Sequence, residues 1–66
     1  MNHPQVREDE LLDEKQVAKI LNVSVGTLQV WRSTKRYPLA YTRIGRAIRY
    51  RRSALLQFIE SRTVSA

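Results

Sequence analysis

Arginines cluster in the second half of the chain. Eight basic residues and no acidic residue lie between Arg32 and Arg52, and seven of the eight are arginine. The planar guanidinium group suits bidentate contacts with phosphate and with guanine. One interpretation is an ordinary basic face that meets only water. The clustering and the preference for arginine over lysine favour a nucleic-acid partner.

Composition excludes most enzyme chemistry. The chain has 66 residues, no cysteine, one histidine (His3) and two glycines, and its net charge is +6. The chain therefore lacks the residues for a thiol nucleophile, for a histidine-based triad, for a zinc site of the usual Cys/His kind and for a glycine-rich phosphate loop. We expect one small domain that is not an enzyme and holds no cofactor or metal. Short apolar runs and the absence of a signal peptide predict a cytoplasmic protein without membrane contact.

Two helix starts follow the acidic leader. Asp13 with Gln16 forms a capping-box pattern, and Ser24 occupies the corresponding position before a second helix. The first helix should end near Asn22, and the second near Lys35, because Pro38 cannot continue it. The turn of three or four residues between them, 22–25, predicts a helix-turn-helix.

Residues 41–50 have the pattern of a β-hairpin with two possible registers. A two-residue turn at 45–46 would put Arg43 and Ile48 on one face. A three-residue loop at 45–47 separates apolar from charged residues, with Thr42, Ile44, Ile48 and Tyr50 on one face and Tyr41, Arg43 and Arg49 on the other. We predict the second register for its amphipathicity, although glycine usually comes last in such loops.

A third helix is predicted from Ser53 to about Arg62. Arg51 and Arg52 precede it at the positive end of the helix dipole, where cations are disfavoured. Either at least one of them contacts phosphate or both extend into water. Residues 1–10 and 63–66 are predicted to be a disordered leader and tail. The predicted core consists of Leu12, Val17, Ala18, Leu21, Val23, Leu28, Trp31, Ile44, Ile48, Tyr50, Leu55, Phe58 and Ile59.

The predicted fold is mainly α with a β-hairpin, a winged helix-turn-helix over residues 11–62. Its second helix would enter the major groove of double-stranded DNA. The DNA-facing residues on that helix are predicted to be Val25, Gly26, Thr27, Gln29, Val30, Arg32 and Ser33. On the hairpin (the wing) and its flanks they are Lys35, Arg36, Arg43, Arg46, Arg49 and Arg51.

Several of these residues have two interpretations. Gln29 could bond to adenine, and Arg32 to guanine or phosphate. Val30 could touch a thymine methyl group or pack against the wing. Gly26 costs the helix about 1 kcal/mol relative to alanine, which favours a close approach of its backbone to phosphate. Thr27 could serve both the core and a phosphate.

The aromatic residues could likewise belong to the core or contact DNA. Trp31 could stack on a base, but it shares a helix face with Leu28, which favours the core. Tyr50 belongs to the core by alternation along its strand. The hydroxyl groups of Tyr37 and Tyr41 could contact phosphate.

From residue 11 to about 62, the chain resembles the excisionase and AlpA-like branch of MerR-type winged helices. The shared signals are Val17-Ala18, Leu21, Val23-Ser24, Thr27, Trp31, the Arg43-Ile44-Gly45-Arg46 wing and Arg49-Tyr50-Arg51. The resemblance implies major-groove contacts by Thr27, Gln29 and Arg32, and minor-groove or phosphate contacts by Arg43, Arg46 and Arg49. Gly26, Val30 and Ala54 depart from the family pattern, which commonly has polar or basic residues at the first two and an acid at the third.

The resemblance also implies a function. We expect an excisionase, a recombination directionality factor that shapes attachment-site DNA and assists a tyrosine integrase in excising a phage or mobile element. Several copies would bind adjacent sites, with possible cooperative self-association. Alternatives are a small transcription regulator of mobile-element genes and an antitoxin-like protein-interaction module. We expect no room in this chain for the dimerisation helix and sensor region of full MerR-type activators.

Overall fold

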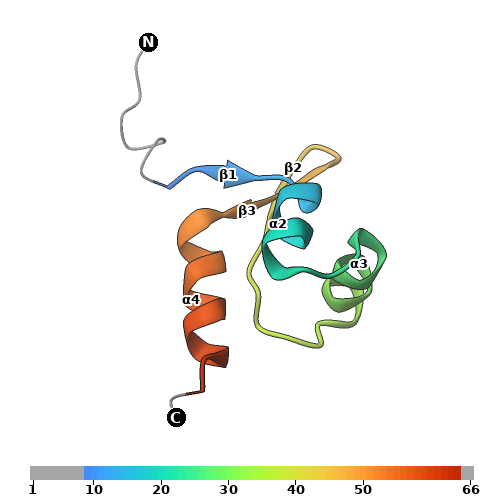
Figure 1. The fold of residues 1–66 in the computed structure, drawn as a ribbon. Coiled ribbons are helices and arrows are strands. Elements are labelled where there is room, and N and C mark those ends of the chain that lie inside the picture. The colour runs from blue at the N-terminus through green and yellow to red at the C-terminus, as the bar shows by residue number, and fades with distance from the viewer. Residues whose placement is uncertain (1–8, 65–66) are drawn as a thin grey trace.

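The structure is a computed structural model that describes residues 9–64. Strand β1 (Leu11–Leu12) comes first, followed by helices α2 (Glu14–Leu21) and α3 (Val25–Thr34). The wing strands β2 (Thr42–Ile44) and β3 (Ala47–Arg51) lead into the last helix, α4 (Arg52–Arg62). Figure 1 shows α2 at the centre, with α3 and α4 on its two sides and the sheet above. The winged helix-turn-helix prediction is confirmed.

The helix-turn-helix forms where its caps predict it. The Asp13 carboxylate accepts from the Gln16 backbone N–H at 2.8 Å, and the Gln16 side chain accepts from the Asp13 N–H at 2.9 Å. Ser24 caps α3 by accepting from the backbone N–H of Thr27 at 3.0 Å. Asn22 and Lys35 end the two helices in the left-handed conformation, with φ of 59° and 54°. These caps satisfy backbone groups that a helix end otherwise leaves unpaired.

The predicted register of the wing is wrong. Arg43 pairs with Ile48 and Ile44 with Ala47, so the turn contains only Gly45 and Arg46. Gly45 has a φ of 60° and Arg46 does not have a positive φ, as in a type II′ turn with glycine first. Ile44 therefore points to the solvent side, and its exposed fraction of 53% contradicts its predicted place in the core.

The N-terminal segment joins the sheet, which the sequence did not predict. Leu11 pairs with Arg51 and Leu12 with Tyr50, which gives the antiparallel order β1-β3-β2. The backbone N–H of Arg52 donates to the carbonyl of Glu10 at 2.8 Å. The leader that was predicted to be disordered, residues 1–10, includes two residues, Asp9 and Glu10, that make specific contacts. Residues 1–8 of that leader lie outside the described residues. The predicted tail is described only for Thr63 and Val64, and its last two residues also lie outside.

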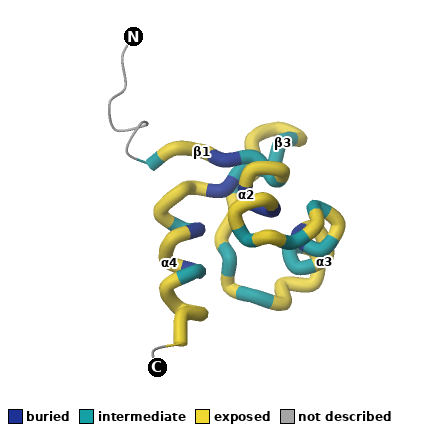
Figure 2. Tube along the Cα trace, viewed as in Figure 1, coloured by how far each residue is buried: buried dark blue, intermediate teal, exposed yellow. Residues whose placement is uncertain are grey.

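The core lies between the sheet and the three helices. Its buried side chains come from β1, α2, α3, β3 and α4, and Figure 2 shows the buried positions on the inner sides of the elements. Predicted core residues that are buried are Leu12, Val17, Ala18, Leu28, Tyr50, Leu55 and Phe58. Those only partly buried against them are Leu21, Val23, Trp31, Ile48 and Ile59. The described part of the chain contains no helix that is long and apolar enough to cross a membrane.

Candidate nucleic-acid interface

A groove lies between α3 and the wing. Its lining comes from three places: the start of α2, one face of α3, and the tip and inner strand of the wing. The lining residues are Asp13, Glu14, Lys15, Val25, Gln29, Arg32, Arg46, Ala47, Ile48 and Arg49. The structure thus brings together five predicted DNA-facing residues from α3 and the wing, namely Val25, Gln29, Arg32, Arg46 and Arg49.

The α3 surface beside the groove is largely open to solvent. Gly26, Gln29, Val30 and Ser33 are exposed, whereas Val25 and Thr27 are half-buried. Val30 has an exposed fraction of 56%, so it does not pack against the wing. A Cβ added at Gly26 would meet only the Ser24 hydroxyl, at 3.8 Å. Nothing in the described chain therefore requires glycine at this position.

Arg32 is engaged inside the protein. Its Nε and Nη2 atoms lie 3.1 and 2.9 Å from Oε2 of Glu14, at the first turn of α2. Its guanidinium carbon also lies 5.7 Å from the centre of the Tyr41 ring, within range of a cation–π contact. Burial is the largest single influence and lowers the pKa of Arg32, but the hydrogen bond and the charge of Glu14, with smaller contributions from Tyr50, together outweigh it and raise the pKa. Arg32 therefore joins α3 to α2 and to the segment before the wing.

Glu14 also contacts the predicted reading residue Gln29. Nε2 of Gln29 donates to Oε1 of Glu14 at 3.3 Å. One carboxylate thus holds both polar side chains that the sequence assigns to base edges. Sequence reasoning missed Glu14 as a site residue, and missed Lys15 and Asp13 beside it. Glu14 could have been identified as the partner of Arg32 only if the packing of the two helices had been known.

Tyr50 lies beneath this cluster. The side chain is fully buried, and its hydroxyl has no hydrogen-bond partner among residues 9–64. Burial raises the pKa of Tyr50, and the negative charge of Glu14 adds to the effect. The phenol therefore stays neutral and serves the core.

The wing arginines do not share one face. Because neighbouring residues of a strand point to opposite faces, Arg49 lies on the face of Thr42 and Arg43 lies on the face of Ile48. Arg46 occupies the second position of the turn and is exposed. Arg49 bends back, and its Nη1 donates to the carbonyl of Ile48 at 2.8 Å. The prediction that Arg43 and Arg49 share the outer face is therefore wrong.

The flanking basic residues lie apart from the groove. Lys35 and Arg36 are exposed at the end of α3, where Arg36 lies over the ring of Tyr37. Arg51 pairs with Asp9 at 3.3 Å, beside the start of α4. In the described chain, that contact and the Arg32–Glu14 pair are the only ion pairs. Lys15, Arg43, Arg46 and Arg49 therefore have no carboxylate partner there.

The fold and the site define a DNA-binding protein of the winged helix-turn-helix class. The chain belongs to the helix-turn-helix domain family, which matches residues 11–63. This membership agrees with the prediction of a DNA-binding protein.

A curated relative covers most of this chain. The transcriptional repressor DcmR of Methylorubrum extorquens (strain DSM 6343 / CIP 106787 / DM4) is 42% identical over 52 residues. The aligned segment makes up 79% of this chain and 20% of the repressor, so the chain spans about a fifth of the length of that relative. No solved structure matches the chain significantly.

Proposed function

We propose that this chain binds double-stranded DNA at specific sites, with α3 in the major groove and the wing on the neighbouring backbone or minor groove. The observation that carries the proposal is the groove in which the α3 face and the wing arginines lie next to each other. A major groove about 12 Å wide admits one helix. The open α3 face and the arginines without carboxylate partners supply base contacts and phosphate contacts respectively.

In this proposal, the exposed face of α3 makes the contacts with the base edges. Gln29 exchanges its long contact with Glu14 for a bidentate contact with adenine, and Val30 meets a thymine methyl group. Thr27 and Ser33 contact the flanking phosphates, and the Gly26 backbone approaches one closely. Lys35, Arg43, Arg49 and Arg51 add phosphate contacts around the site, where Arg51 would first leave Asp9. Arg36 lies over the ring of Tyr37, away from the groove, and makes no phosphate contact in this proposal. Arg32 does not contact a base in this proposal, because Glu14 holds its guanidinium group. Its contribution is to fix the position of α3 against α2.

The biological role that we propose is regulation of transcription through occupancy of a DNA site. It is supported by the 42% identity to a transcriptional repressor. The similarity lies within the DNA-binding domain of residues 11–63. A bound domain would exclude polymerase from an overlapping promoter.

A second candidate is the recombination directionality factor, in the excisionase and AlpA-like branch of MerR-type proteins. It is supported by the resemblance of residues 11–62 to that branch. In this role several copies would bind adjacent sites, associate cooperatively and assist a tyrosine integrase.

Selection of binding sites from a random DNA pool tests the DNA-binding proposal. We expect the wild-type chain to enrich one motif, with an AT-rich segment one groove away from the positions read by α3, because a narrow minor groove attracts inserted arginine. Arg46→Ala should weaken that AT preference and leave the positions read by α3 unchanged. It should also reduce the salt slope of log K by about 1. Failure to enrich any motif would contradict specific binding.

Two assays separate the biological roles. In a reporter assay, a promoter carrying the selected motif should be repressed by the wild-type chain. In an excision assay, a tyrosine integrase and its attachment sites should yield more excision product when the chain is added. Repression without any effect on excision favours the regulator, and the reverse favours the directionality factor.

A further inference from the structure

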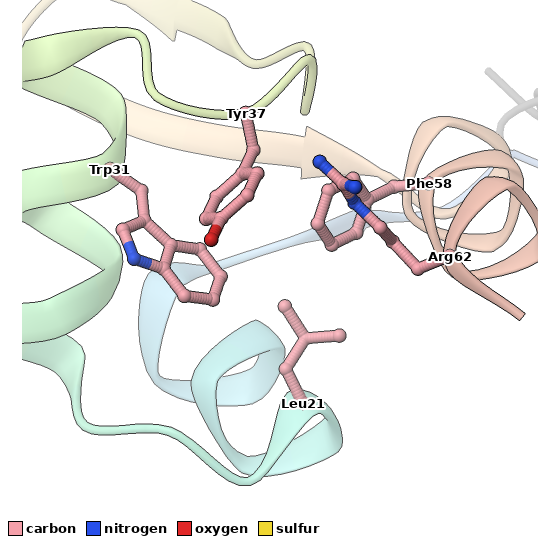
Figure 3. A pocket seen from close by; sticks show the side chains of 5 residues that line it. All are labelled: Leu21, Trp31, Tyr37, Phe58 and Arg62. Atoms are coloured by element: carbon pink, nitrogen blue, oxygen red, sulfur yellow. The ribbon is translucent and has the colours of Figure 1, made fainter.

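An apolar pocket is lined by residues none of which belongs to the groove between α3 and the wing. Its walls are Leu21 of α2, Trp31 of α3, Tyr37 of the connection to the wing, and Phe58 of α4, and Arg62 lies at its edge (Figure 3). The rings of Trp31 and Tyr37 meet edge to face with centres 4.8 Å apart, and those of Tyr37 and Phe58 lie 6.1 Å apart. Four elements thus contribute one apolar side chain each to a concave site.

With α3 in the major groove, as in the proposed function on which this step rests, the pocket stays accessible. Successive helix residues are about 100° apart, so Trp31 lies about 160° around α3 from Gln29. Trp31 is only half-buried although it packs against the core. A large aromatic side chain left partly open in a concave apolar site is typical of a surface that binds an apolar group.

Two guanidinium groups flank the same ring of the pocket. The guanidinium carbons of Arg62 and Arg36 lie 4.7 and 5.4 Å from the centre of the Tyr37 ring. The proximity of Arg36, with a smaller contribution from Arg62, lowers the pKa of Tyr37. Neither arginine pairs with a carboxylate of residues 9–64. An apolar site with two unpaired cations is complementary to an apolar group that carries negative charge beside it.

We propose that this pocket docks an acidic segment of a partner protein. One aliphatic or aromatic side chain of the segment enters between Trp31 and Phe58, and adjacent carboxylates pair with Arg36 and Arg62. Docking there leaves the groove between α3 and the wing open, so the chain can hold DNA and the partner at the same time.

A second copy of this chain fits the pocket less well. Its acidic and apolar segment, residues 10–14, is already used within the fold. Leu12 is buried, Asp13 caps α2 and Glu14 pairs with Arg32. Glu10 and Leu11 are exposed but are held in place, because Leu11 pairs with Arg51 of β3 and the Glu10 carbonyl accepts from the N–H of Arg52.

Fluorescence tests this proposal without DNA, so its outcome is independent of the proposed function. Trp31 is the single tryptophan of the chain, and its emission reports on the pocket directly. The probe is an acetylated and amidated peptide of sequence EELFEE. We expect a saturable change in emission with this peptide, weaker binding of the glutamine version QQLFQQ, and no saturation with EEAAEE.

Variants identify the docking site. Arg62→Gln and Arg36→Gln should each weaken EELFEE binding about two- to fivefold, as expected for an exposed ion pair. Arg46→Gln, a matched change on the wing, should leave peptide binding unchanged. Circular dichroism of each variant verifies the fold.

Three results would overturn the proposal. The first is the absence of a saturable emission change with EELFEE. The second is equal peptide affinity of the wild type, Arg36→Gln and Arg62→Gln. The third is an emission change that depends on protein concentration alone and accompanies a dimer in sedimentation, which would make a second copy the occupant.

Discussion

The carboxylate of Asp9 caps helix α4 by accepting a hydrogen bond from the backbone N–H of Ser53 at 3.0 Å, although 44 residues separate the two. The other carboxylate oxygen lies 3.3 Å from Nη1 of Arg51. Arg51 precedes α4 and provides no side-chain cap of its own. A negative charge at this end of the helix is favourable, so Asp9 offsets the cost that Arg51 and Arg52 impose there.

Asp9→Asn should remove a pH-dependent part of the stability. The bond from the Ser53 backbone lowers the pKa of Asp9 below its usual value, with a smaller contribution from Arg51. Because the folded pKa is depressed, this contribution is present above the unfolded pKa of about 3.9 and is lost as pH falls through the folded pKa. Thermal unfolding from pH 6 to pH 2.5 should show a shallower acid decline in Asp9→Asn. Glu10→Gln is the control, because Glu10 contributes its backbone carbonyl; an equal decline in both variants would contradict the assignment.

Glu14→Gln should lower the sequence specificity of DNA binding and raise the affinity for DNA of unrelated sequence. The change removes the negative charge that pairs with Arg32 and thereby one negative charge from the DNA groove, although the glutamine oxygen can still accept a hydrogen bond. We expect a stability loss of about 1–3 kcal/mol, typical of a lost hydrogen bond to a charged group. Affinity for unrelated DNA should rise, and the ratio of specific to non-specific affinity should fall, as measured by anisotropy titrations at fixed salt. Glu60→Gln removes the same charge on α4 and should leave that ratio unchanged; a similar fall there would mean that net charge alone matters.

Leu28→Ala and Val30→Ala should separate the two faces of α3. Leu28 is 1% exposed and Val30 is 56% exposed. Truncation of a buried leucine costs about 2–5 kcal/mol, whereas a change at an exposed position usually stays within about 0.5 kcal/mol. Urea unfolding should therefore show a large loss for Leu28→Ala only, and DNA titrations a loss for Val30→Ala. Equal stability of the two variants would mean that α3 is rotated from its position here.

Gly26→Ala should stabilise the free protein and weaken DNA binding. Alanine in the helix is favoured over glycine by about 0.5–1 kcal/mol, and the added methyl group has room beside Ser24. On DNA, the same methyl group would obstruct a close approach of the backbone to phosphate. Thermal unfolding and DNA titration of one protein sample measure both effects. A variant that gains stability and keeps its DNA affinity would show that no phosphate approaches Gly26.

Local signals in the sequence predicted the helix-turn-helix well. Asp13, Gln16 and Ser24 act on backbone groups within three residues of themselves, so their pattern can be recognised without knowledge of the fold. The wing shows how two local signals can conflict. Amphipathicity favoured a loop of three residues, but the conformational freedom of Gly45 at the first turn position decided the register and turned Ile44 to solvent.

Contacts between distant residues could not be predicted in the same way. Strand β1 has only two residues, and no pattern in Leu11 and Leu12 indicates that β3 will pair with them. The contact of Glu14 with Arg32 joins two helices whose relative packing depends on the whole core. Sequence reasoning therefore proposed residues of α3 and the wing for the candidate site and missed the residues at the start of α2 that line the same groove.

The order of strands in the sheet has a consequence for synthesis of the protein. Strand β1 emerges from the ribosome first, but its partner β3 ends only at Arg51. The helix-turn-helix is complete by Lys35, yet Tyr50, Leu55 and Phe58 of its core are still to be made. The nascent recognition helix therefore lacks much of the surface that holds it until α4 has been made. Folding of this domain should accordingly wait until Phe58 has been made, as one cooperative event that produces the recognition helix and the wing together.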